Sequence, residues 1–148
     1  MAFTGNFMCT SFKVQLMEGV HDFRFATGDV FKLALYDNNA SFTAATTAYT
    51  PVNEVANSGS YTAGGGILTP ITPTSSGVTA FTSFVDLSFT GATITAYGAL
   101  IYNSTPNLPY TNPAVCILDF GGPKTSSSGT FTIVFPTADS TDAIIRLA

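Results

Sequence analysis

The stretch CILDFGGPKTSSSGTFTIVFP, residues 116–136, decides the class of fold. Apolar side chains recur at every second position in its first and last parts, and a period of two is typical of β-strands. Between these parts, the Gly-Gly-Pro triplet at 121–123 supplies backbone angles that interrupt a strand, and a run of Thr and Ser follows. We therefore predict strands at 113–120 and 129–136, joined by a mobile polar turn.

Most of the remaining chain also consists of short strand-like segments. The clearest is VFKLALY, residues 30–36, which is apolar on nearly both faces and so fits the centre of a sheet. The further predicted strands cover residues 66–72, 79–89, 92–103 and 142–147. Short strands at this spacing favour a sandwich or a barrel over a parallel α/β sheet. We predict a jelly-roll-like β-sandwich.

One segment, CTSFKVQLMEGV at residues 9–20, has helical spacing instead. Phe12 and Leu16 form an apolar i, i+4 pair, a hydroxyl of Thr10 or Ser11 can cap the start, and Gly19 can end the helix. We therefore expect an all-β or mainly β fold with one short helix in an N-terminal segment 1–20. We expect residues 1–148 to form a single domain.

The composition points to a folded chain with an unusually neutral surface. Hydrophobic residues make up 45% of the 148 residues and charged residues 9%, whereas about a quarter charged is usual. The five Lys and Arg are scattered singly and the net charge is −4, so we expect no nucleic-acid partner. We also expect no membrane partner, because no apolar run approaches the roughly 18 residues of a membrane helix. Either neighbouring subunits cover the neutral surface, or it is the ordinary face of a Thr-rich β protein.

No motif indicates catalysis. Asp119-Phe120-Gly121 matches the metal-binding triplet of protein kinases but has no partner motifs, and GGPK lacks the spacing of a phosphate loop. His21, the single histidine, has no evident nucleophile to activate, so we interpret it as a structural or surface residue. Cys9 and Cys116 are expected to be reduced structural thiols. We expect no enzyme activity, no catalytic residues, no cofactor and no metal.

Several blocks, spread from one end of the chain to the other, carry a family resemblance. They are FMCTSFKVQLMEGVHDF, GDVFKLALYDN, TTAYTPVNEV, SYTAGGGIL, GALIYN, AVCILDFGG, FTIVFP and AIIRLA. With these blocks the chain resembles a family of small structural proteins encoded by tailed bacteriophages. Within that group it is most similar to the capsid cement, or decoration, proteins.

This resemblance implies a β-sandwich or jelly roll that bridges major capsid protein subunits on the outside of the virion, after synthesis in the host cytoplasm. The implied partners are the major capsid protein and copies of the chain itself, as a homodimer or homotrimer. It also makes the N-terminal segment and the polar connection 40–66 the leading contact regions. Because aromatic residues are enriched at interface hot spots, the subunit-contact candidates are Phe3, Phe7, Tyr49, Tyr61 and Tyr110.

Two other functions remain open from the sequence. One is a tail component, a fibre or adaptor domain that binds host glycans or other tail proteins. The other is a small β-sandwich enzyme, which the missing catalytic constellation disfavours.

Overall fold

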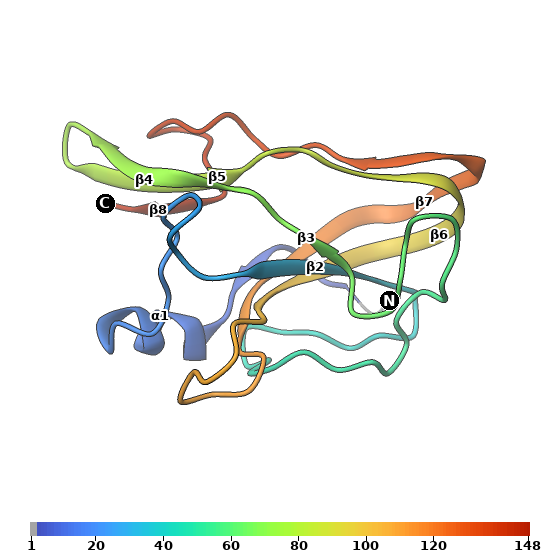
Figure 1. The fold of residues 1–148 in the computed structure, drawn as a ribbon, viewed down its shortest axis with the longest axis horizontal. Helices are drawn as coiled ribbons and strands as arrows, with labels where there is room; N and C mark the ends of the chain where they lie inside the picture. The colour runs from blue at the N-terminus through green and yellow to red at the C-terminus, as the bar shows by residue number, and fades with distance from the viewer. Residues whose placement is uncertain (1–2) are drawn as a thin grey trace.

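The computed structural model describes residues 3–148 as two antiparallel β-sheets with one short helix (Figure 1). The elements in chain order are β1 (Phe7–Met8), α1 (Thr10–Met17), β2 (Phe31–Tyr36), β3 (Gly66–Ile67), β4 (Pro70–Ser76), β5 (Thr79–Phe84), β6 (Leu87–Asn103), β7 (Ala114–Ile133) and β8 (Ile145–Leu147). One sheet has the strand order β1-β7-β6-β2-β3 and the other β4-β5-β8. The predicted mainly β sandwich with an N-terminal helix is confirmed.

The strand order does not confirm the jelly-roll-like arrangement. Consecutive strands lie side by side in two hairpins, β4–β5 and β6–β7, and β8 pairs with β5. Strand order depends on pairing between distant segments, which local sequence patterns do not contain.

The predicted turn at 121–128 is wrong, because β7 runs without a break from Ala114 to Ile133. Gly98 of β6 pairs with Asp119, and Ala96 pairs with Lys124, so one β6 residue faces the four residues 120–123 of β7. Such a bulge absorbs Gly-Gly-Pro while the pairing continues on both sides. Proline is tolerated there because β7 is an edge strand beyond its short pairing with β1.

Other boundaries differ in a similar way. Residues 92–103 and the end of the predicted strand 79–89 belong to one long strand, β6, whereas residues 66–72 are divided between β3 and β4. The break between β5 and β6 falls at 85–86. The strand predicted at 30–36 is confirmed as β2.

The long hairpin β6–β7 belongs to both layers of the sandwich. Its register runs from Leu87 opposite Ile133 to Tyr102 opposite Ala114, with several bulges in between. Figure 1 shows the two strands curving together at one end of the molecule, from the layer of β4 and β5 into the layer of β2. Bulges increase local bending, so they account for this curvature.

The helix α1 packs against the sandwich through Phe12, whose side chain is fully buried. Cys9 occupies the N-cap position and makes no side-chain capping bond, so the predicted capping by Thr10 or Ser11 is wrong. Gly19 follows the helix with a φ of 74°, as expected of a helix-ending glycine. Within residues 3–148, no helix has the length and apolar character needed to cross a membrane.

Candidate functional site

Two of the five contact candidates lie in the core of the chain itself. Phe3 is 4% exposed and packs beside Phe42, with ring centroids 5.9 Å apart. Tyr61 is fully buried, and its ring meets Phe89 edge to face. Both residues were selected because aromatic side chains are enriched at interface hot spots, whereas here they pack inside the core of the chain itself.

Tyr49 and Tyr61 instead converge on one carboxylate, that of Glu54. The Tyr49 hydroxyl donates to Glu54 Oε2 at 2.7 Å and the Tyr61 hydroxyl to Oε1 at 2.8 Å. The backbone N–H of Gly64 donates to Oε1 at 2.6 Å. We call these four residues the Glu54 cluster. Sequence reasoning did not select Glu54, because no motif marks a carboxylate whose partners are spread over 49–64.

The Glu54 cluster ties the connection 40–66 to the sheets. The Tyr61 hydroxyl also accepts from Leu35 N of β2 at 2.9 Å, and the Tyr49 ring stacks on Tyr102 of β6 at 4.6 Å. Burial, followed by the Glu54 carboxylate, raises the pKa of Tyr102 to about 12. Burial likewise raises the pKa of Tyr49 and Tyr61, so both hydroxyls stay protonated as donors at neutral pH. This arrangement organises the connection 40–66.

His21 has both ring nitrogens engaged, as expected for a structural histidine. The Nδ1 atom lies 3.0 Å from the Asn103 side-chain nitrogen, which can only donate, so Nδ1 accepts. Nε2 therefore carries the proton and donates to Gln15 Oε1 at 2.8 Å. Burial lowers the pKa of His21 to about 4, against the opposing effect of the Asp29 carboxylate. The neutral ring thus links α1 to the end of β6.

The two cysteines are free and buried, as predicted. Burial raises the pKa of Cys9 to about 11 and also raises that of Cys116. A protonated, buried thiol is a poor nucleophile and a poor metal ligand. Residues 3–148 hold no group of three or more His, Cys, Asp or Glu side chains arranged for a metal ion.

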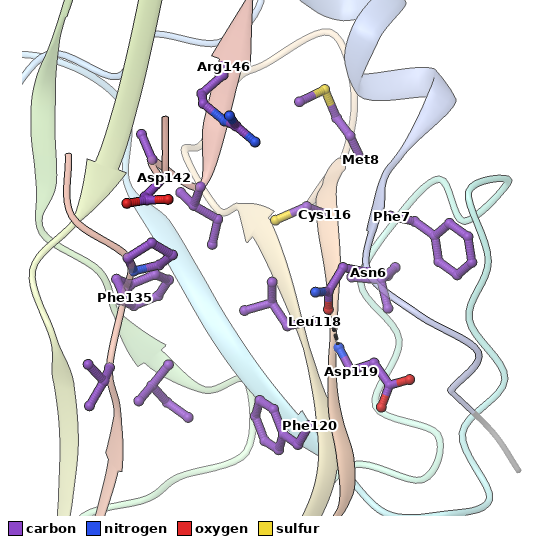
Figure 2. A pocket seen from close by; sticks show the side chains of 16 residues that line it. Asn6, Phe7, Met8, Cys116, Leu118, Asp119, Phe120, Phe135, Asp142 and Arg146 are labelled. Carbon is purple, nitrogen blue, oxygen red and sulfur yellow. Dashed lines mark hydrogen bonds between the residues drawn. The ribbon is translucent and has the colours of Figure 1, made fainter. Parts of the chain in front are cut away.

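A groove of about 440 Å³ opens at the outer edge of β7 (Figure 2). Its apolar lining comes from β1, β7 and the segment before β8, and includes Met8, Leu118, Phe120, Phe135 and Ile144. Asp119, Asp142 and Arg146 are the charged residues in its lining. The contact candidate Phe7 is half-buried at this groove. The fifth candidate, Tyr110, is exposed on the loop after β6 and donates to Glu18 Oε2 at 2.9 Å.

Residues 71–78 in the hairpin of β4 and β5 are all exposed, whereas residues 81–84 of β5 are buried. We call this hairpin the hairpin arm (residues 70–84). After Pro70, every residue of β4 is exposed, so neither face of this strand is covered. Val78 at the turn is 92% exposed, and Figure 1 shows this turn at one end of the molecule. Residues 55–85 contain no charged side chain. The sequence analysis predicted strands here and missed their exposure.

No protein-family model, no curated protein and no solved structure matches the chain. The groove, the Glu54 cluster and the hairpin arm are therefore the features from which its function is argued.

Proposed function

We propose that the chain is a structural virion protein of a tailed bacteriophage, a capsid cement or decoration protein that bridges major capsid protein subunits. The observation that carries this proposal is the hairpin arm, which has no charged residue and whose strand β4 and turn are exposed. In this role the chain acts without a catalytic site or cofactor. It is made in the host cytoplasm and assembles on the outside of the shell.

The chemistry of the hairpin arm supports burial against another protein. Its exposed strand, β4, forms the edge of the sheet β4-β5-β8. Its side chains are Thr, Ser, Pro and apolar residues, including Ile71 at 37% exposed and Val78. The cores of protein interfaces are depleted in charge in the same way. A neighbouring capsid subunit, or a further copy of the chain in a dimer or trimer, would cover this surface.

The interior of the molecule suits such a role as well. The Glu54 cluster and the His21 network hold long connections to the sheets through side-chain hydrogen bonds. A rigid scaffold lowers the entropy lost on binding, because fewer groups have to be ordered. In the proposed role, the hairpin arm extends from this rigid scaffold.

A binding experiment tests whether the hairpin arm contacts the capsid. Capsid shells of the phage that encodes the chain, prepared without it, are mixed with purified wild-type protein or with Val78→Asp. We expect the substitution to reduce the number of bound copies strongly, because it brings a carboxylate into an apolar contact. Met17→Asp is the matched control, since Met17 of α1 is 84% exposed and also apolar. Equal binding of wild-type protein and Val78→Asp would exclude the arm as the contact.

Copy number and position in purified virions test the role itself. A cement protein is present in hundreds of copies distributed over the shell. A few to a few dozen copies at the tail vertex would contradict the proposal and favour a tail fibre or adaptor.

A further inference from the structure

The outer edge of β7 is largely uncovered. Within residues 3–148, β1 is the strand that pairs with this edge, and its register involves Phe7 with Ile117 and Met8 with Cys116. The rest of β7 continues to Ile133. An uncovered edge of this length is a template for pairing with a strand of another copy.

The hydrogen bonds near β1 show which N–H groups of β7 point outward. Cys9 N donates to Val115 O at 3.0 Å across this edge. Because backbone groups alternate between the two sides of a strand, Val115, Ile117 and Asp119 present theirs toward β1. The bulge at residues 120–123 interrupts this alternation after Asp119.

Asp119, Gly121 and Pro123 each lack a free N–H. Asn6 Oδ1 accepts from Asp119 N at 2.7 Å, the bond dashed in Figure 2. Asp119 Oδ1 accepts from Gly121 N at 2.8 Å. Pro123 has no N–H at all. The Asn6 side chain thus takes the place of the next residue of β1, at the point where β1 does not extend further.

The bulge adds a geometric obstacle to the same stretch. Gly121 has a φ of 72° and Gly122 a φ of 139°, so the chain leaves the extended path that a partner strand would follow. Open space surrounds both glycines, so packing does not explain why glycine occurs there.

We propose that Asn6, Asp119 and Pro123 form an edge block that prevents residues 119–123 of β7 from pairing with a strand of another copy. Because Asp119, Gly121 and Pro123 offer no free N–H, strand addition is unfavourable along this stretch. Association is then left to other surfaces. This inference rests on the strand edge and is independent of the proposed capsid role.

The test is the triple variant Asn6→Ala/Asp119→Ala/Pro123→Ala, which frees two N–H groups and restores a third. We expect its sedimentation coefficient to rise with concentration above that of the wild-type protein. We also expect the amides of residues 119 and 121 to exchange more slowly with deuterium as concentration rises.

The matched control is Asp37→Ala/Asn57→Ala. Asp37 Oδ1 accepts from Asn39 N at 2.7 Å and Asn57 Oδ1 from Ala63 N at 2.6 Å, so two exposed side-chain caps are removed outside any strand edge. This control is expected to sediment like the wild type. If the control associated as strongly as the triple variant, the edge block would be overturned. Association would then follow from the loss of any side-chain acceptor and not from a change at the edge of β7.

A folded triple variant that sediments like the wild type at every concentration would also overturn the proposal. If the triple variant does not fold, the single variants Asn6→Ala and Pro123→Ala test the edge block instead. Each is expected to show weaker concentration dependence of the same kind, and wild-type behaviour in both would refute the edge block.

Discussion

At the scale of single residues, Glu54 shows how one carboxylate organises a long connection. It accepts from two tyrosine hydroxyls and one backbone N–H, all between residues 49 and 64. Both tyrosines were selected from the sequence because they are aromatic. Their shared contact with Glu54 could not be predicted from the sequence. This contact depends on which side chains the folded connection 40–66 brings together.

Replacing Glu54 by Ala is expected to destabilise the protein. The change leaves the buried Tyr61 hydroxyl and the Gly64 N–H without their acceptor, which corresponds to about 2–3 kcal/mol of unfolding free energy. Urea denaturation followed by circular dichroism measures the loss. Glu18→Ala is the control, because it removes a carboxylate from the exposed hydroxyl of Tyr110 and should cost less than about 0.5 kcal/mol. Equal effects of the two variants would contradict a structural role for the Glu54 cluster.

His21 predicts a pH dependence of stability. Burial lowers its pKa from 6.5 to about 4 in the folded protein, so between these values the unfolded chain binds the proton more readily. Stability is therefore complete above about pH 6.5 and falls as the pH decreases toward 4. Because solvent reaches part of the ring, we expect a loss of about 1–2 kcal/mol rather than the full equivalent of the shift.

Melting temperatures measured from pH 7 to pH 5 test this expectation in the wild type and in His21→Gln. The wild type should lose stability over this range, and the variant should lose less. An NMR titration that placed the pKa of His21 near 6.5 in the folded protein would contradict the assignment.

At the scale of elements, the sequence predicted strands better than it predicted where they end. Gly-Gly-Pro at 121–123 carries every local signal of a turn, and β7 nevertheless continues through it because β6 pairs with both flanks. Likewise, β2 was recognised because both of its faces are apolar, a property visible in six consecutive residues. A pairing partner distant in sequence overrides a local turn signal, and no local pattern records that partner.

Gly98 of β6 provides a prediction for the packing of the hairpin. A methyl group at this position would come within 2.4 Å of Phe3 Cε1 and 2.5 Å of Leu118 O. We therefore expect Gly98→Ala to lower the unfolding free energy by about 3 kcal/mol, because backbone and ring would have to move apart.

Gly121→Ala is the control for this prediction. Gly121 has a φ of 72° but open space around it, so a methyl group costs only the conformational strain of about 1 kcal/mol. Chemical denaturation of both variants measures the difference. A smaller loss in Gly98→Ala than in Gly121→Ala would contradict the placement of Phe3 in the core.

At the scale of the whole molecule, composition indicated the neutral surface but not its location. Residues 55–85 contain no charged side chain, yet the same sequence would also fit a buried sheet. The structure shows instead that β4 is exposed on both faces. Exposure depends on what packs above a strand and beside it, and within residues 3–148 β4 is an edge strand of its sheet.

If the hairpin arm makes the contact with capsid subunits, attachment should depend little on ionic strength. Charged side chains are 9% of the chain and none lies in residues 55–85, so few ion pairs are available for salt to screen. Raising the salt concentration from about 0.1 M to 1 M shortens the Debye length from about 10 Å to 3 Å and weakens contacts between exposed charges. We expect the number of copies retained on purified shells to be the same at both concentrations. Sedimentation of washed shells followed by quantitative gel analysis measures retention, and electron microscopy checks that the shells stay intact. Release of most copies from intact shells at 1 M salt would show that charged contacts hold the protein, and would exclude the neutral arm as its main attachment.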